Sequence, residues 1–348
     1  MLPYKRFMIS IAMFTILAVL TWHSVPKIHV RKTLSSIQDQ FSSIIRDNYE
    51  SEDSISSTYQ TLGDDTVPNV VEQWKEDFNM SSENTFAYMF GTTEVQVGGS
   101  VPKGCSLLFI GIHSGPDMAD RRNAMRQTYL KYITPDIVYR FILGNPTQDL
   151  VDENEHFKDM VFINQRERYT ALDSVLPYKA ATIFVIASRM TTRPQWILKT
   201  DDDSLVNMPK LLEKLPKLME NYYYGSCVFN GYPIRDTHSK WHVDDSFWPD
   251  GKPYPPFCVG TGYFMSTKAY TCAANFIQLS SHKYFPREDV SGGMLMSKCN
   301  VSAYTIHNIY SGGPSSHNTG FLIQHYVKTP DMVHRLWDKI VEKYGNES

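Results

Sequence analysis

From Cys105 onward, short apolar runs alternate with longer stretches that have helical periodicity. Continuous apolar runs are typical of strands in parallel sheets that are covered on both faces, and the intervening helices supply that cover. The expected strands are at 106–112, 140–143, 160–163 and 196–199, and the expected helices are at 117–132, 178–190 and from Pro330 to about 344. The pattern predicts an α/β fold with a mostly parallel sheet flanked by helices.

Three consecutive acids, Asp201-Asp202-Asp203, follow the strand predicted at 196–199. Ligands of open α/β sheets bind at the carboxyl ends of the strands, where this triplet lies. Adjacent carboxylates repel one another, so a cation or hydrogen-bond donors must stabilise them. Carboxylate oxygens suit Mg²⁺ or Mn²⁺, whereas the Gly and Glu of a calcium loop are missing at the required offsets. The residues alone leave open a divalent-metal site and a simple acidic loop tip.

Two further segments have a pattern that suits a ligand site. Glu288 and Asp289 open an expected helix, where acids are favoured by the helix dipole, and either could also serve as a general base. The segment 254–266 combines a Pro-rich turn with Gly260 and Gly262, which permit a close approach of backbone to a ligand.

The N-terminus indicates a secretory route. Lys5 and Arg6 precede an uncharged run from Phe7 to Trp22. A membrane span needs about 20 residues, but thin membranes of the early secretory pathway accept shorter ones. A cleaved signal peptide is the alternative, although no small-x-small cleavage site follows the run. The positive-inside rule predicts a cytoplasmic tail at 1–6, a signal anchor at 7–22 and a lumenal remainder.

The polar stretch 23–100 cannot bury much surface and is predicted to be a lumenal stem, with the folded body at 101–348. Sequons at Asn79 and Asn300 are predicted N-glycosylation sites and agree with a lumenal body. The five cysteines form no CxxC pair, which argues against a zinc site, and they allow two disulfides with one cysteine left over. The net charge of −3 gives no indication of a nucleic-acid partner.

Six ordered motifs between about residues 104 and 340 resemble the β-1,3-galactosyltransferase family of inverting glycosyltransferases. They are the strand 107–114 followed by Arg122, Arg126, Thr128 and Tyr129; Phe141-Ile142-Leu143-Gly144; Lys199-Thr200-Asp201-Asp202-Asp203 with Asn207; Lys240-Trp241 with the segment Tyr254 to Tyr263; Glu288-Asp289-Val290; and His325, Pro330 and Trp337.

The resemblance implies a GT-A-type, Rossmann-like fold and a metal-dependent hexosyltransferase. Such an enzyme moves a sugar from a UDP-hexose to a glycan acceptor on a glycoprotein or glycolipid, and the resemblance favours galactose as that sugar. The linkage would be β-1,3, formed with inversion. The family's members are single-pass type II proteins of the Golgi membrane, held there by the N-terminal anchor, with a lumenal catalytic domain.

The resemblance also implies roles for individual residues. Asp289 would be the general base, and Glu288 would orient it or bind the acceptor. Asp203, Asp201 and His325 would hold Mn²⁺ or Mg²⁺. The residues implied to bind the nucleotide sugar are Arg122, Arg126, Lys199, Asp201, Asp202, Gly260 and Gly262. Trp241 and Trp248 suit either stacking on a sugar face or core packing.

The chain departs from the family pattern in two places. Two family cysteines are replaced by Met190 or Thr191 and by Leu295, which suggests the loss of a disulfide between them. A family segment that bears on substrate choice is degraded between Glu167 and Lys179. Three alternatives therefore stay open: transfer of N-acetylglucosamine from UDP-GlcNAc, a catalytically inactive lumenal binding partner, and a membrane-anchored adhesion domain.

Overall fold

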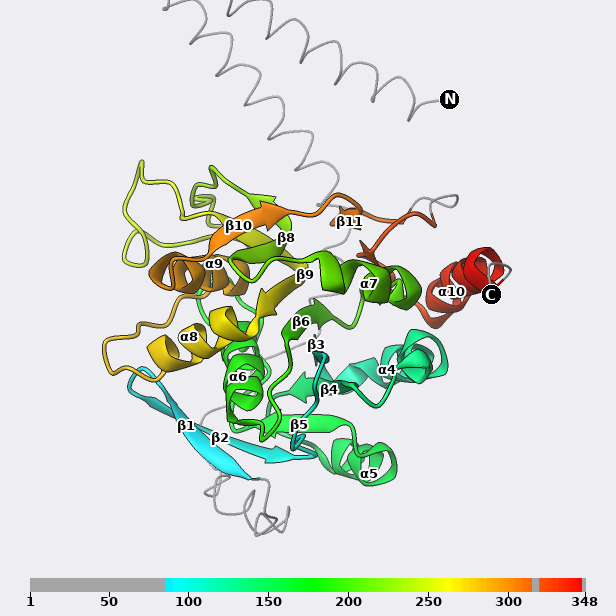
Figure 1. Cartoon of the computed structure of the whole chain (residues 1–348). Coiled ribbons are helices and arrows are strands. Elements are labelled where there is room, and N and C mark those ends of the chain that lie inside the picture. The colour runs from blue at the N-terminus through cyan, green and yellow to red at the C-terminus, as the bar shows by residue number, and fades with distance from the viewer. Residues whose placement is uncertain (1–84, 315–318, 346–348) are drawn as a thin grey trace, which may run out of the picture. The chain divides into compact units, whose positions relative to one another are not determined.

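The computed structural model describes residues 85–314 and 319–345, in which a nine-stranded sheet has the order β1-β2-β5-β4-β3-β6-β9-β8-β10 (Figure 1). The strands are β1 (Phe86–Phe90), β2 (Thr93–Gly99), β3 (Leu108–His113), β4 (Ile137–Leu143), β5 (Met160–Ile163), β6 (Trp196–Asp201), β8 (Tyr222–Val228), β9 (Phe257–Ser266) and β10 (Ser302–Thr305). The four central strands β5, β4, β3 and β6 are mutually parallel, and β2 and β9 flank them in the antiparallel direction. The predicted parallel core is confirmed, and an all-β adhesion module is excluded for this part of the chain.

Helices cover both faces of this sheet. They are α4 (Ala119–Gln127), α5 (Gln148–Phe157), α6 (Leu176–Arg189), α7 (Met208–Lys214), α8 (Thr267–Ile277), α9 (Glu288–Lys298) and α10 (Pro330–Gly345). One apolar cluster joins the sheet to α4, α5, α7 and α10, and a second joins it to α6, α8 and α9 (Figure 1). Side chains of β3 alternate between them, since Leu108 and Ile110 belong to the first cluster and Phe109 to the second.

The predicted helix at 117–132 is interrupted. A 3-10 turn (Pro116–Met118) leads into α4, which ends at Gln127, and a second 3-10 turn (Tyr129–Tyr132) follows. Thr128 has non-helical dihedral angles, and its hydroxyl donates to the carbonyl of Ala124. A hydroxyl that bonds the preceding turn in this way competes with continuation of the helix.

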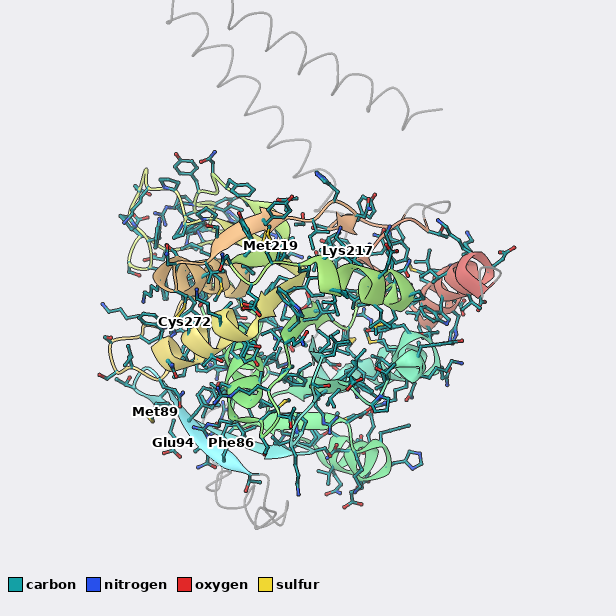
Figure 2. The ribbon with its side chains drawn as sticks, in the orientation of Figure 1. Phe86, Met89, Glu94, Lys217, Met219 and Cys272 are labelled. Carbon is teal, nitrogen blue, oxygen red and sulfur yellow. A yellow bond between two sulfur atoms is a disulfide. The ribbon has the colours of Figure 1, made fainter. Side chains whose placement is uncertain are left out.

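The boundary predicted at residue 100 is wrong, because the last part of the stretch assigned to the stem is folded. Strands β1 and β2 form a hairpin that pairs with β5 through Val97 to Gly99. Figure 2 marks Phe86, Met89 and Glu94 on this hairpin, whose outward side chains are polar or partly exposed. The inward side chains Val95 and Val97 are completely buried, so the body begins no later than Phe86.

The hairpin is held in place by the loop after α8. The ring of His282 packs edge-on against Phe90 with a centroid distance of 4.7 Å, and both of its nitrogens are buried without a hydrogen-bond partner in the described residues. Because burial disfavours the charged ring, the pKa of His282 falls to about 4, from 6.5 for an unperturbed histidine.

Because His282 is buried uncharged, we expect the protein to lose unfolding free energy in acid. Between pH 6.5 and 4 the unfolded chain binds a proton at His282 that the folded chain does not, so the free energy of unfolding should fall as the pH falls. With partial solvent screening we expect a loss of about 2 kcal/mol at this site. Denaturant unfolding at pH 7 and 4.5 measures it, and His282→Phe, which keeps the ring contact, should remove about that much of the difference. An unchanged difference in the variant would contradict the assignment.

The cysteines form two disulfides, Cys227–Cys258 between β8 and β9 and Cys272–Cys299 between α8 and the end of α9, and Cys105 is free and buried. Cys272 is marked on α8 in Figure 2. Met190 and Leu295 are both buried in the cluster beneath α6 and α9. Of the positions at which the resemblance led us to expect cysteines, Met190 and Leu295 are thus filled by apolar packing, whereas the alternative Thr191 is exposed.

The N-terminal predictions fall mostly outside the described residues. The tail at 1–6, the anchor at 7–22, the sequon at Asn79 and the stem up to residue 84 lie there. Within 85–314 and 319–345, no helix combines the length and apolarity that a membrane crossing requires. Asn300 lies in an exposed turn between α9 and β10, with a left-handed φ of 54°.

Candidate active site

The aspartate triplet lies where β3 and β6 end side by side, with His113 in register with Asp201. The three side chains take different directions. Asp202 accepts hydrogen bonds from Ser114 Oγ at 2.8 Å and from Arg121 Nη1 at 3.1 Å, and it is almost fully buried. Asp202 is therefore engaged by the β3–α4 connection, which leaves Asp201 and Asp203 for a ligand.

A small second sheet brings His325 to these two acids. Strand β12 (Ile323–Gln324) lies between β11 (Ile309–Tyr310) and β7 (Leu205–Val206), and it runs antiparallel to β7 just after the triplet. The backbone N–H of Val327 also donates to the carbonyl of Asp203 at 2.8 Å. Antiparallel pairing thus places the residue after β12 beside the residues before β7. Helix α10 follows and buries Val333, Leu336, Trp337 and Ile340.

Asp201, Asp203 and His325 form a group that fits a divalent metal. His325 Nε2 is 3.0 Å from Asp203 Oδ1 and 4.0 Å from Asp201 Oδ2. One ligand atom from each residue lies within 4.8 Å of the others. Two carboxylates and one imidazole are a donor set that Mn²⁺ accepts, and Mg²⁺ accepts the oxygens.

Asp203 and His325 shift each other's pKa values. Burial alone would raise the pKa of Asp203, but the hydrogen bond and charge of His325 outweigh it, and the pKa lies below its usual value. Burial likewise lowers the pKa of His325, and Asp203 outweighs that effect and raises it. Asp203 is therefore ionised near neutral pH, as a metal ligand must be.

A buried lysine connects the triplet to α9. Lys199 Nζ donates to Asp201 Oδ1 at 2.8 Å and to the carbonyl of Gly260 at 2.8 Å, and it lies 3.1 Å from Glu288 Oε2. Burial lowers the pKa of Lys199, but Asp201 and Glu288 outweigh it and raise the value. Lys199 therefore stays charged and fixes the orientation of both acids.

Glu288 and Asp289 have different environments. Glu288 is buried, accepts a hydrogen bond from Tyr263 at 2.5 Å, and has a pKa that burial raises despite Lys199. The side chain of Asp289 is 16% exposed, and its Oδ1 accepts from the N–H of Val290 at 2.9 Å. Glu288 is thus held inside the protein by Tyr263 and Lys199, whereas the side chain of Asp289 is partly exposed.

The two glycines implied to bind the donor differ in role. A Cβ at Gly260 would lie 3.2 Å from Lys199 Nζ, 3.4 Å from Glu288 and 3.7 Å from Asp201, so this glycine borders the charged site. A Cβ at Gly262 would lie 2.6 Å from Ile323 Cδ1. Gly262 therefore leaves room for β12, the strand that precedes His325, and this packing contact accounts for the glycine without a ligand.

The arginines are also placed differently from the expectation. Arg122 is completely buried, pairs with Glu153 at 2.6 Å, and reaches Asp202 only through Ser114. Arg126 donates to Asp159, Glu153 and Asn123. The structure instead brings their neighbour Arg121 to Asp202. The sequence gives no signal for this choice, because three basic positions of one helix differ only in the direction that each side chain takes.

The buried ion pairs of Arg126 with Glu153 and Asp159 indicate a structural role for this arginine. Its side chain is 8% exposed and that of Asp159 is 4% exposed, so Arg126→Met would leave the buried Asp159 carboxylate without its cation, whereas Glu153 would keep Arg122. We expect a loss of about 3 kcal/mol in unfolding free energy, with UDP affinity of the folded variant changed less than about threefold. Denaturant unfolding and UDP titration of the same sample measure both. A large loss of UDP affinity in a stable variant would restore Arg126 as a nucleotide contact.

The degraded segment after β5 retains a buried ion pair. Lys179 Nζ contacts both carboxylate oxygens of Glu167 at 2.8 Å and donates to the carbonyl of Ser114 at 2.7 Å. Tyr169, which is 53% exposed, lies over this pair with its hydroxyl 3.1 Å from Lys179. These contacts attach the segment to the end of β3, beside the triplet. His113 at that strand end is buried, with neither ring nitrogen hydrogen-bonded within the described residues.

The two tryptophans that were candidates for sugar stacking have different environments. Trp248 packs against Tyr254 and Phe285, which favours core packing, whereas Trp241 is 40% exposed.

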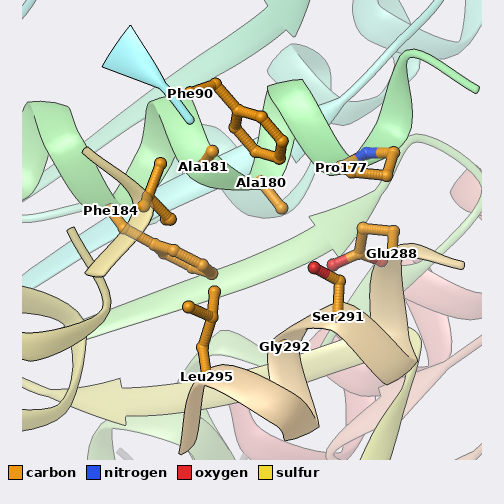
Figure 3. Close-up of a pocket in the computed structure, with 10 residues that line it drawn as sticks. Phe90, Pro177, Ala180, Ala181, Phe184, Glu288, Ser291, Gly292 and Leu295 are labelled. Atoms are coloured by element: carbon orange, nitrogen blue, oxygen red, sulfur yellow. The ribbon is translucent and has the colours of Figure 1, made fainter. Parts of the chain in front are cut away.

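Figure 3 shows a small pocket between α6 and α9, with Glu288 and Ser291 at one end and apolar side chains such as Phe184 and Leu295 around it. It has room for about one water molecule and is too small for a hexose.

Comparisons with known proteins identify the family of the chain. A family model described as Galactosyltransferase matches residues 120–307, more than half of the chain. Beta-1,3-galactosyltransferase 1 of Homo sapiens is 27% identical over 246 residues, which cover 64% of this chain and 71% of that protein. Hydroxyproline O-galactosyltransferase GALT2 of Arabidopsis thaliana is 28% identical over 252 residues, which cover 68% of this chain and 35% of that protein.

Among solved structures, the galactosyltransferase LgtC in complex with donor and acceptor sugar analogs has a TM-score of 0.37 at 10% identity, covering 69% of this chain and 100% of that one. The glycosyltransferase GlyE of Streptococcus pneumoniae has a TM-score of 0.35 at 9% identity, covering 70% of this chain and 64% of that one. The family match includes the end of β6 and the start of α9, where the acidic residues of the site lie. The chain therefore belongs to the galactosyltransferase family, and it is a glycosyltransferase.

Proposed function

We propose that the protein transfers galactose from UDP-galactose to a glycan acceptor in β-1,3 linkage, with inversion and with a divalent metal. The observation that supports this most is the meeting of Asp201, Asp203 and His325 from two distant segments of the chain. Relatives named beta-1,3-galactosyltransferase supply the choice of donor and linkage. The fold that goes with this activity is the GT-A type.

Asp203, Asp201 and His325 would hold Mn²⁺ or Mg²⁺, and the ion would supply positive charge to the diphosphate of UDP as it leaves. Lys199 keeps Asp201 in place and is itself held by Glu288. Gly260 leaves the space beside these groups free of a side chain. Each of these residues holds the donor side of the site in a fixed geometry, as electrostatic catalysis requires.

Asp289 is the proposed general base. Its carboxylate is partly exposed at the start of α9, and it would take the proton from the acceptor hydroxyl as that oxygen attacks the anomeric carbon. Attack from the face opposite the leaving UDP inverts the configuration. Lys199 and Glu288 connect this helix to Asp201, so acceptor and donor groups are held by one ionic chain.

The predicted anchor at 7–22 supports the proposal that the enzyme is a single-pass type II protein of the Golgi membrane, with its catalytic domain and the sequons at Asn79 and Asn300 in the lumen. The acceptor would then be a glycoprotein or glycolipid of the secretory pathway.

A donor panel tests the proposed sugar. The protein is expressed in a secretory host, and UDP release is measured with UDP-galactose, UDP-GlcNAc, UDP-GalNAc and UDP-glucose, with and without Mn²⁺. We expect Mn²⁺-dependent release that is fastest with UDP-galactose. Faster release from UDP-GlcNAc would make the protein an N-acetylglucosaminyltransferase and would contradict the galactose assignment.

A further inference from the structure

Arg287, the residue before Glu288 and Asp289, has an unusual environment. Its side chain is 16% exposed, and its guanidinium carbon lies 3.9 Å from the centre of the Trp241 ring. The nearest carboxylate is that of Asp289, with Nη2 3.9 Å from Oδ1, which is too long for a hydrogen bond. Burial lowers the pKa of Arg287.

Other cations around the site are paired directly. Lys199, Arg121, Arg122, Arg126 and Lys179 each have a carboxylate oxygen within 3.1 Å. Within the described residues, Arg287 has no contact of this kind, and the ring of Trp241 covers one side of its guanidinium. A guanidinium offers a planar fork of donors that matches a carboxylate, so the unused donors of Arg287 are suited to an anion.

A second cation lies at the same ring. Lys240 is exposed, its Nζ is 5.0 Å from the centre of Trp241, and it forms no salt bridge in the part of the chain that the structure describes. By contrast, Arg235 in the same loop is paired with Asp245 and Asp250. Two cations thus lie at the exposed ring, and Asp289 is the one carboxylate within 4.0 Å of their charged nitrogens in the described residues, which leaves a local excess of positive charge.

We propose that Arg287, Lys240 and Trp241 form a subsite for an acidic acceptor sugar of the hexuronic acid class. The sugar's carboxylate would pair with Arg287 and Lys240, and the exposed part of Trp241 would contact the sugar ring. The subsite is next to Asp289, so a sugar bound there has a hydroxyl in the region of the proposed base. This inference rests on the proposed function, because it names the acceptor of that reaction.

The test is calorimetric titration of the full-length protein, with UDP and Mn²⁺ present, using methyl β-D-glucuronide and methyl β-D-glucoside. These probes differ only in the carboxylate. We expect the glucuronide to bind at least about tenfold more tightly, since charge-assisted hydrogen bonds are the strong ones. Arg287→Met should abolish the preference and leave glucoside binding unchanged, whereas Arg287→Lys should keep part of it. Lys252→Met is the matched control, because Lys252 lies over Trp248 of the same loop in a similar way.

Equal binding of the two probes to the unaltered protein would overturn the proposal, as would an equal loss of both in Arg287→Met. If Arg287→Met does not fold, Lys240→Met decides, since its exposed side chain can be shortened without disturbing the core. UDP binding is measured in the same samples. If UDP does not bind but the glucuronide is still preferred, the proposed function is contradicted and the subsite is not. If UDP binds but the glucuronide is not preferred, the subsite alone is contradicted.

Discussion

Asp289→Asn is expected to lower kcat by about 10²–10⁴-fold, because general-base catalysis contributes about that much. Asparagine has the size and shape of aspartate and can still accept a hydrogen bond from the N–H of Val290, but it cannot take a proton. UDP affinity in the presence of Mn²⁺ should change little, since Asp289 belongs to the acceptor side. Steady-state kinetics with saturating UDP-galactose and acceptor measure kcat, and titration measures UDP binding.

A matched control for Asp289→Asn is Asp331→Asn, because Asp331 is an exposed acid in the first turn of α10. It makes the same chemical change at another helix start and should leave kcat unaffected. If Asp289→Asn kept more than about a tenth of the turnover of the unaltered protein, Asp289 would not be the base.

Asp203→Ala is expected to abolish the effect of Mn²⁺ on UDP binding, with an apparent affinity at least about tenfold weaker, as for the unaltered protein without the metal. Asp203 is the acid nearest to His325 and the one whose pKa that histidine lowers. Its removal leaves Asp201 and His325, whose closest atoms are 4.0 Å apart, as two ligands. Titration of UDP over a range of Mn²⁺ concentrations gives the affinity and its metal dependence together.

The neighbouring acid supplies the control for that variant. Asp202→Asn removes a carboxylate of the same triplet, but Asp202 is bound by Ser114 and Arg121 and lies outside the metal group. This variant should keep the Mn²⁺ dependence of UDP binding and lose stability instead. A loss of Mn²⁺ dependence in Asp202→Asn, with none in Asp203→Ala, would reverse the assignment of the two acids.

The sequence predicted the parts of this site that depend on long, regular patterns. The strand predicted at 160–163 is β5 as observed, and the apolar run of β6 placed the triplet at a strand end. Buried strands have a composition that differs from that of loops, so their ends are visible in the sequence. The approach of His325 was expected from the resemblance alone, because β12 has two residues and gives no periodic signal.

The sequence did not predict features that depend on where single side chains point. The β1–β2 hairpin lies in a stretch of mostly polar composition, and its apolar side chains that face the core are few: Tyr88, Phe90, Val95 and Val97. Arg121 and Arg126 lie on the same helix, yet one contacts Asp202 and the other pairs with Asp159, since their side chains leave the helix in different directions. Gly262 matches a family glycine, but its nearest neighbour is Ile323. Tertiary contacts decide each of these cases.

The central claim is that Asp201, Asp203 and His325 form a metal site that holds a nucleoside diphosphate, and it is tested most directly by calorimetric titration of UDP with and without Mn²⁺. We predict that UDP binds in the presence of Mn²⁺ and at least about tenfold more weakly after chelation of the metal, a difference that corresponds to about 1.4 kcal/mol or more. The same affinity for UDP with and without Mn²⁺, or no binding of UDP in either condition, would contradict the account.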